Sequence, residues 1–135
     1  MEEEKPQILS SLLSSIVSQV GIIVPDWKKA VEPWIRLGRT FQMTRLNASN
    51  CTDYVVNGVK KDVDFDVYIV LPPETYEVEF IQPLSDEGES MYSQYLRRNP
   101  QGGIQHFVLK PSEGVDPSQV VDEMKRLNIP SICEF

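Results

Sequence analysis

Histidine and cysteine are scarce in this chain, and their scarcity excludes several kinds of catalytic site. Among 135 residues there is one histidine, His106, and there are two cysteines, Cys51 and Cys133, which stand far apart and form no CxxC motif. One histidine with two distant cysteines indicates neither a Ser-His-Asp triad nor a Cys-His nucleophile. The cysteines are typical of the reduced thiols of a cytoplasmic protein.

A positive field and long apolar runs are also missing. The chain has 13 basic and 20 acidic residues and a net charge of −7, so no basic surface is expected to attract nucleic-acid phosphates. The longest apolar run covers 20–24, which is too short to cross a membrane. The start is acidic where a secretory signal would be basic. We therefore expect a cytoplasmic protein with neither nucleic acid nor membrane as partner.

Apolar pairs and serine pairs alternate over residues 8–17. The spacing of four places the apolar side chains on one helical face. Serine is only a middling helix former, so a helix here needs a partner surface to be stable. The segment predicts an amphipathic helix that packs on its own domain or, alternatively, serves in dimerisation.

The rest of the chain alternates strand and helix patterns. Residues 19–24 are a β-type run, and a helix is expected over 27–37 because Asp26 is a good N-cap and Gly38 suits the position after the helix. Also expected are a hairpin at Asn57-Gly58, strands at 41–46, 63–69, 76–82 and 104–109 and from residue 131, and helices at 91–96 and 117–127.

The two longer helices resemble each other in register. When Asp26 is superimposed on Asp116, Gly38 falls on Asn128, and glycine and asparagine best tolerate a left-handed conformation. The apolar stripe matches as well, with Val31, Trp34 and Leu37 falling on Val121, Met124 and Leu127. Two unrelated amphipathic helices would share some of these features, but duplication of a βαβββ unit accounts for more of them.

The duplication predicts four segments. These are an N-terminal helix over 1–18, a first βαβββ module over 19–83, a linker with a short helix over 84–104, and a second module over 105–135. The second module is too short for its last two strands, so it is expected to be incomplete at the C-terminus. An open sheet edge invites pairing. We therefore expect a homodimer in which a neighbouring chain covers this edge, unless the N-terminal helix folds over it.

Several segments resemble the vicinal oxygen chelate superfamily, which includes glyoxalases, bleomycin resistance proteins and dioxygenases. The opening Gln-Val-Gly-Ile-Ile-Val-Pro-Asp, from Gln19 to Asp26, resembles the start of these proteins. The segment Glu-Phe-Ile-Gln-Pro-Leu-Ser from Glu79, followed later by Gly-Ile-Gln-His up to His106, resembles methylmalonyl-CoA epimerase and glyoxalase I. The resemblance covers about residues 18–135. It implies an α+β fold of paired βαβββ modules, whose curved mixed sheet forms a cup for a divalent metal.

The resemblance also implies the metal ligands. Gln19 occupies the first-strand position, where the superfamily usually has histidine, while Glu79 and His106 match the ligands of two further strands. The fourth ligand, usually glutamate, would lie on a strand that this chain lacks. Glu79 and His106 are strong ligand types, whereas Gln19 offers a neutral amide oxygen. A mixed nitrogen and oxygen set suits Co, Ni, Mn, Fe or Zn, and binding by this chain alone would be weak or absent.

Strand parity places the three candidate ligands on one side. Gln19, Glu79 and His106 each alternate with apolar neighbours along their strands. If the apolar faces pack on helices, the three polar side chains look into the cup. Two alternatives stay open, because His106 could be an ordinary hydrogen-bonded strand residue and Glu79 could share a solvated face with Glu77.

Three functions fit these observations. The first is a metal-dependent epimerase-like isomerase or glyoxalase-like lyase that acts on a small carbonyl compound or acyl-CoA thioester through an enolate, with Glu79 as the catalytic carboxylate. The second is a metal-free module that binds a small molecule in the same cup, which Gln19 and the missing fourth ligand favour. The third is a non-catalytic scaffold. Metal dependence separates the first two, and ligand protection of Trp27 and Trp34 from quenching separates the last two.

Overall fold

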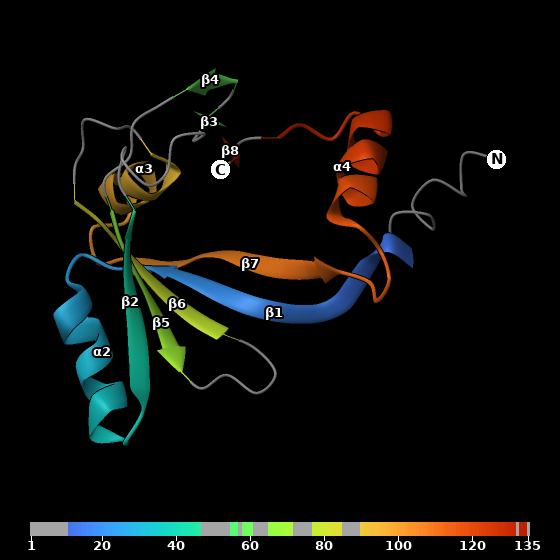
Figure 1. Cartoon of the computed structure of the whole chain (residues 1–135). Helices are drawn as coiled ribbons and strands as arrows, with labels where there is room; N and C mark the ends of the chain where they lie inside the picture. The colour runs from blue at the N-terminus through green and yellow to red at the C-terminus, as the bar shows by residue number, and fades with distance from the viewer. Residues whose placement is uncertain are drawn as a thin grey trace.

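A mixed five-stranded sheet forms the centre of the protein (Figure 1). The structure, a computed structural model, describes residues 11–46, 55–56, 58–60, 65–71, 77–84, 90–131 and 133–134. The helices are α2 (Trp27–Arg36), α3 (Met91–Arg98) and α4 (Pro117–Arg126). The strands are β1 (Leu13–Ile23), β2 (Thr40–Leu46), β3 (Val55–Val56), β4 (Val59–Lys60), β5 (Phe65–Leu71), β6 (Glu77–Pro83), β7 (Gly103–Pro111) and β8 (Cys133–Glu134).

The order of the strands in the large sheet is β2-β5-β6-β1-β7. β1 runs parallel to β6 and antiparallel to β7, and the other neighbours are antiparallel. The elements β1, α2, β2, β5 and β6 form the expected first βαβββ unit, with the β3–β4 hairpin inserted between β2 and β5. The predicted α+β class is therefore confirmed, whereas the division into four segments stays a prediction.

β1 corrects the prediction for the N-terminal helix. The strand begins at Leu13, so the helix expected over 8–17 is wrong from that residue onward, and residues 8–10 lie outside the described part of the chain. Val17 pairs with Leu109 of β7. Pairing with a distant strand outweighs the apolar spacing here, because a serine-rich segment has little helix propensity of its own.

α2 packs on one face of the sheet and forms the main apolar cluster there. Asp26 begins the helix as predicted, and its carboxylate accepts hydrogen bonds from the backbone N–H groups of Lys28 and Lys29. Val31 of the helix is buried against Val24 of the β1–α2 turn and Phe80 of β6. The remaining members of the cluster are Ile22, Trp27, Ala30, Trp34, Phe41 and Val78.

A small second sheet has the order β4-β3-β8. Val56 pairs with Val59 across the predicted hairpin, where Gly58 has a φ of 79°. Cys51 and Asn57 lie outside the described residues. The last predicted strand is present as β8, but it pairs with β3 instead of joining the large sheet.

α4 resembles α2 in its local structure but not in its position. Asp116 caps it in a capping box, and Asn128 after its end has a φ of 57°, as Gly38 after α2 has one of 80°. In Figure 1, α4 stands above the β1–β7 pair, whereas α2 lies below the level of that pair. The caps and stripe of a helix fix its ends and its apolar face, but not the direction in which the preceding connection sends it.

The face of β7 that was expected to pack on a helix is exposed. Phe107 lies opposite Val20 on β1, yet 61% of it is exposed, and Leu109 is 45% exposed. The condition that apolar faces pack on helices thus holds for β6, where Phe80 is buried, and does not hold for β7. None of the described helices is long and apolar enough to cross a membrane.

Candidate functional site

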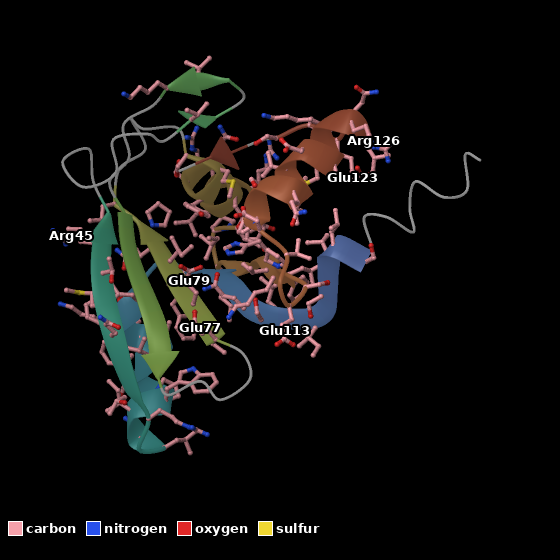
Figure 2. All side chains as sticks on the ribbon, turned by 45° about the vertical axis from the view of Figure 1, so that its right-hand side comes forward. Arg45, Glu77, Glu79, Glu113, Glu123 and Arg126 are labelled. Carbon is pink, nitrogen blue, oxygen red and sulfur yellow. The ribbon has the colours of Figure 1, made fainter. Side chains whose placement is uncertain are left out.

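The strands β6, β1 and β7 bring two of the predicted site residues to the same level of the sheet. Gly21 of β1 lies opposite Glu79 of β6 on one side and opposite His106 of β7 on the other. The side chains of Glu79 and His106 reach toward each other across the glycine, on the face opposite Phe80. Figure 2 labels Glu79 and Glu77 one above the other along β6.

Glu79 and His106 face each other at close range. Oε2 of Glu79 lies 3.4 Å from Nε2 of His106, and the two side chains are 14% and 22% exposed. Among the described residues, no lysine or arginine forms an ion pair with Glu79. The carboxylate therefore has the imidazole as its close partner in a partly buried position.

Gly21 creates the space that the His106 ring occupies. A Cβ atom at position 21 would lie 1.9 Å from Cε1 of His106 and 2.2 Å from Nε2. Gly21 is not among the glycines with a positive φ, so its backbone would accept any side chain. The contact with the ring, and not the backbone conformation, is the reason for a glycine here.

The ring of His106 has two further neighbours. Its Nδ1 lies 2.5 Å from Oε1 of Gln105. The ring of Tyr92 on α3 lies beside it, with 6.2 Å between the ring centroids, and Tyr92 is 4% exposed. Neither neighbour was predicted from the sequence. The position of Gln105 beside the single histidine was a usable signal, whereas nothing in the sequence placed α3 over this face.

Gln19 lies on the same face but at the next level of the sheet. Its Cα is opposite Glu77 and Val108, and its Nε2 donates a hydrogen bond of 3.1 Å to Oε2 of Glu77. The structure thus brings Glu79 and His106 together and places Gln19 with Glu77. The parity prediction is confirmed for all three residues, but the grouping of Gln19 with the other two is not observed.

α3 covers the end of this face beyond Glu79. Ile23 and Ile81 lie opposite each other at the next level, and both are buried. Ser93 of α3 is buried as well, and Ser90 caps the helix by accepting a hydrogen bond from the backbone N–H of Ser93. The site therefore has an apolar closed end under α3 and a polar end at Gln19 and Glu77.

The pair at the centre of this face fits two ligands of one cation. Two ligand atoms about 2.1 Å from a tetrahedral metal are about 3.4 Å apart, and this equals the separation of Oε2 and Nε2. Carboxylate oxygen and imidazole nitrogen suit the transition metals named above. Among the described residues, no group of three His, Cys, Asp or Glu side chains could hold a metal. The described site supplies two strong ligands.

The comparisons with known proteins agree with this arrangement of strands. Residues 18–132 match the model of the glyoxalase/bleomycin resistance protein/dioxygenase superfamily. The chain belongs to this superfamily. A search of curated protein sequences finds no match.

Two solved structures show the same fold as this superfamily member. A crystal structure of methylmalonyl-CoA epimerase from Mycobacterium tuberculosis has a TM-score of 0.60 and 19% identity, covering 88% of this chain and 67% of that one. A hypothetical protein from Bacillus halodurans C-125 has a TM-score of 0.55 and 19% identity, covering 85% of this chain and 70% of that one. At this identity the likeness shows the fold alone.

Proposed function

We propose that this superfamily member binds a divalent transition metal between Glu79 and His106 and uses it to isomerise or cleave a small carbonyl compound or acyl-CoA thioester. The observation that supports the proposal most directly is the separation of 3.4 Å between Oε2 of Glu79 and Nε2 of His106. Gly21 supports it too, because the missing side chain is what lets the ring lie so close to the carboxylate. The likeness to methylmalonyl-CoA epimerase supports the choice of substrate class.

The bound metal would act as a Lewis acid that polarises a carbonyl oxygen. His106 and Glu79 would hold it, and Gly21 and Tyr92 restrain the imidazole so that little reorganisation is needed. Oε2 of Glu79 faces the imidazole, which leaves Oε1 as the oxygen to take a proton from the carbon beside the carbonyl. The closed apolar end at Ile23 and Ile81 would exclude water from one side of the reacting group.

A metal titration tests this proposal. Metal-stripped protein is titrated with Co²⁺ and Ni²⁺ beside His106→Ala and Glu79→Gln, with Glu113→Gln as the control. Glu113 is an exposed residue of the β7–α4 connection that lies apart from Glu79 (Figure 2). Stoichiometric binding that is lost in the two site variants and kept in the control supports the proposal. Absence of binding to the wild type at high micromolar metal would overturn it.

A metal-free binding module is the second candidate. It is favoured by the position of Gln19, whose amide nitrogen donates a hydrogen bond to Glu77. Gln19 therefore does not join Glu79 and His106 as a third metal ligand. Quenching of Trp27 and Trp34 would report poorly on such a ligand, because both tryptophans belong to the apolar cluster on the other face. Calorimetry with metal-stripped protein and acyl-CoA thioesters is the better test. Binding that is independent of metal and unchanged in His106→Ala would favour this candidate over the enzyme.

We propose that a second copy of this chain binds to the exposed face and the outer edge of β7, so that the protein forms a homodimer. Among the described residues β7 pairs only with β1, and its exposed apolar side chains are Ile104, Phe107 and Leu109. β7 carries no acidic residue in a chain of net charge −7, so two copies meet there with little repulsion. A strand edge that pairs with itself about a two-fold axis is self-complementary.

Sedimentation velocity at micromolar concentration tests the dimer. The wild type is expected to be a dimer, Phe107→Lys a monomer, and Leu37→Lys a dimer like the wild type. Leu37 is the matched control because it is a large apolar residue that is 77% exposed at the end of α2, away from β7. A monomeric wild type, or a dimer that Phe107→Lys leaves intact, would refute this interface.

A further inference from the structure

β7 contains a bulge directly beside the candidate metal ligand. Gly21 of β1 lies opposite His106, whereas the next residue, Ile22, lies opposite Ile104. One step along β1 therefore corresponds to two steps along β7, and Gln105 is the extra residue. Bulges re-aim side chains, and they are common next to active sites.

The bulge places two neighbouring side chains on the same side of the strand. Adjacent residues of a regular strand point to opposite faces, so they do not contact each other. Here, Oε1 of Gln105 lies 2.5 Å from Nδ1 of His106. An amide oxygen only accepts hydrogen bonds, so this contact is a hydrogen bond when Nδ1 carries the proton.

In a neutral ring, the other nitrogen of His106 then carries a lone pair. Nε2 faces Oε2 of Glu79 at 3.4 Å, which is longer than the usual N–H···O range of about 2.7 to 3.2 Å. Two electron-pair donors that face each other at this distance suit a shared cation better than a direct hydrogen bond. Gly21 beneath the ring and Tyr92 beside it restrict its rotation.

We propose that Gln105 is a positioning residue that fixes the tautomer of His106. By accepting the hydrogen bond of Nδ1, it keeps the proton off Nε2 and directs that nitrogen toward Glu79. This role in metal binding rests on the proposed function. Metal-binding histidines commonly donate a hydrogen bond from their second ring nitrogen, and this bond fixes their tautomer. The tautomer itself is a property of the metal-free protein and can be measured without any metal or substrate.

The single histidine makes the measurement unambiguous. A long-range proton–nitrogen correlation spectrum of nitrogen-15-labelled, metal-stripped protein shows one imidazole ring, recorded at about pH 9, where an ordinary imidazole is neutral. The wild type is expected to be protonated at Nδ1. Gln105→Leu removes the acceptor and should shift the ring toward the Nε2-protonated form. Gln105→Glu supplies another acceptor and should restore the Nδ1-protonated form.

Gln42→Leu is the matched control, because Gln42 is an exposed residue of β2, separated from β7 by three strands. Its spectrum should equal that of the wild type. A wild-type ring protonated at Nε2 overturns the proposal, and so does a Gln105→Leu ring that keeps the wild-type tautomer. If Gln105→Leu fails to fold, a wild-type or Gln105→Glu ring that is protonated at Nε2 still refutes the proposal.

A parallel Co²⁺ titration separates this proposal from the proposed function. Removing a residue that hydrogen-bonds to a metal-binding histidine typically weakens metal binding about 10- to 100-fold. We expect a loss of Co²⁺ affinity of this size in Gln105→Leu and none in Gln42→Leu. If the wild type binds no Co²⁺ but the tautomer responds to Gln105 as expected, the metal function fails and the positioning role stands.

Discussion

Substitution of Gly21 by alanine tests the geometry on which the site depends. The added Cβ would lie 1.9, 2.2 and 2.4 Å from three ring atoms of His106, and contacts under 3.0 Å require something to move. To reach an ordinary contact of 3.4 Å, the ring must withdraw by about 1.5 Å. Gly21 on one side and the ring of Tyr92 on another limit where it can go.

The expected cost follows from two opposing effects. Forcing extra volume into a packed position costs about 1 to 3 kcal/mol. Replacing glycine in a strand with alanine stabilises the folded state by about 0.5 to 1 kcal/mol, because the unfolded chain then has less conformational entropy to lose. We therefore expect Gly21→Ala to lower the free energy of unfolding by about 1 kcal/mol and the Tm by about 4 °C. Co²⁺ affinity should fall as well, because the ring no longer lies beside Glu79.

A double-mutant cycle with His106→Ala makes the test specific. Without the ring, the Cβ at position 21 has room, so Gly21→Ala should be neutral or stabilising by up to about 1 kcal/mol. Chemical denaturation of the four proteins gives the coupling free energy, which we expect to be about 1 to 3 kcal/mol. Equal effects of Gly21→Ala with and without the ring would refute the view that this glycine exists to accommodate His106.

Two further predictions concern the helix caps. Asp26→Ala should lower the free energy of unfolding by about 1 kcal/mol, because the carboxylate caps α2 through the N–H groups of Lys28 and Lys29; an unchanged denaturation midpoint would contradict this. The pKa of Asp116 is lowered, mainly by the backbone N–H of Ser118 and then by its side chain. Its contribution to stability is therefore present above the pKa of the unfolded chain and is lost as the pH falls through the folded value. In Asp116→Asn, stability measured by thermal unfolding should depend less steeply on pH across this acid window, and an unchanged slope would disprove the assignment.

The sequence by itself determined the local structure and the face on which the site residues lie. Proline, glycine and cap residues such as Asp26 and Asp116 act through their own backbone and near neighbours, so the ends of α2 and α4 agree with the prediction. The two-residue period of a strand put Glu79 and His106 on one face before their partners were known. The superfamily resemblance rested on these same segments and is confirmed.

Only the tertiary structure decided what depends on distant residues. Leu13 and Val17 belong to a strand because β7 lies beside them, although their spacing suits a helix. The position of α4 left Phe107 exposed, since a cap and an apolar stripe do not fix where a helix goes. The contact between Glu79 and His106 requires Gly21 beneath the ring and the register of three strands. These relations join segments far apart in the chain, and no local pattern encodes them.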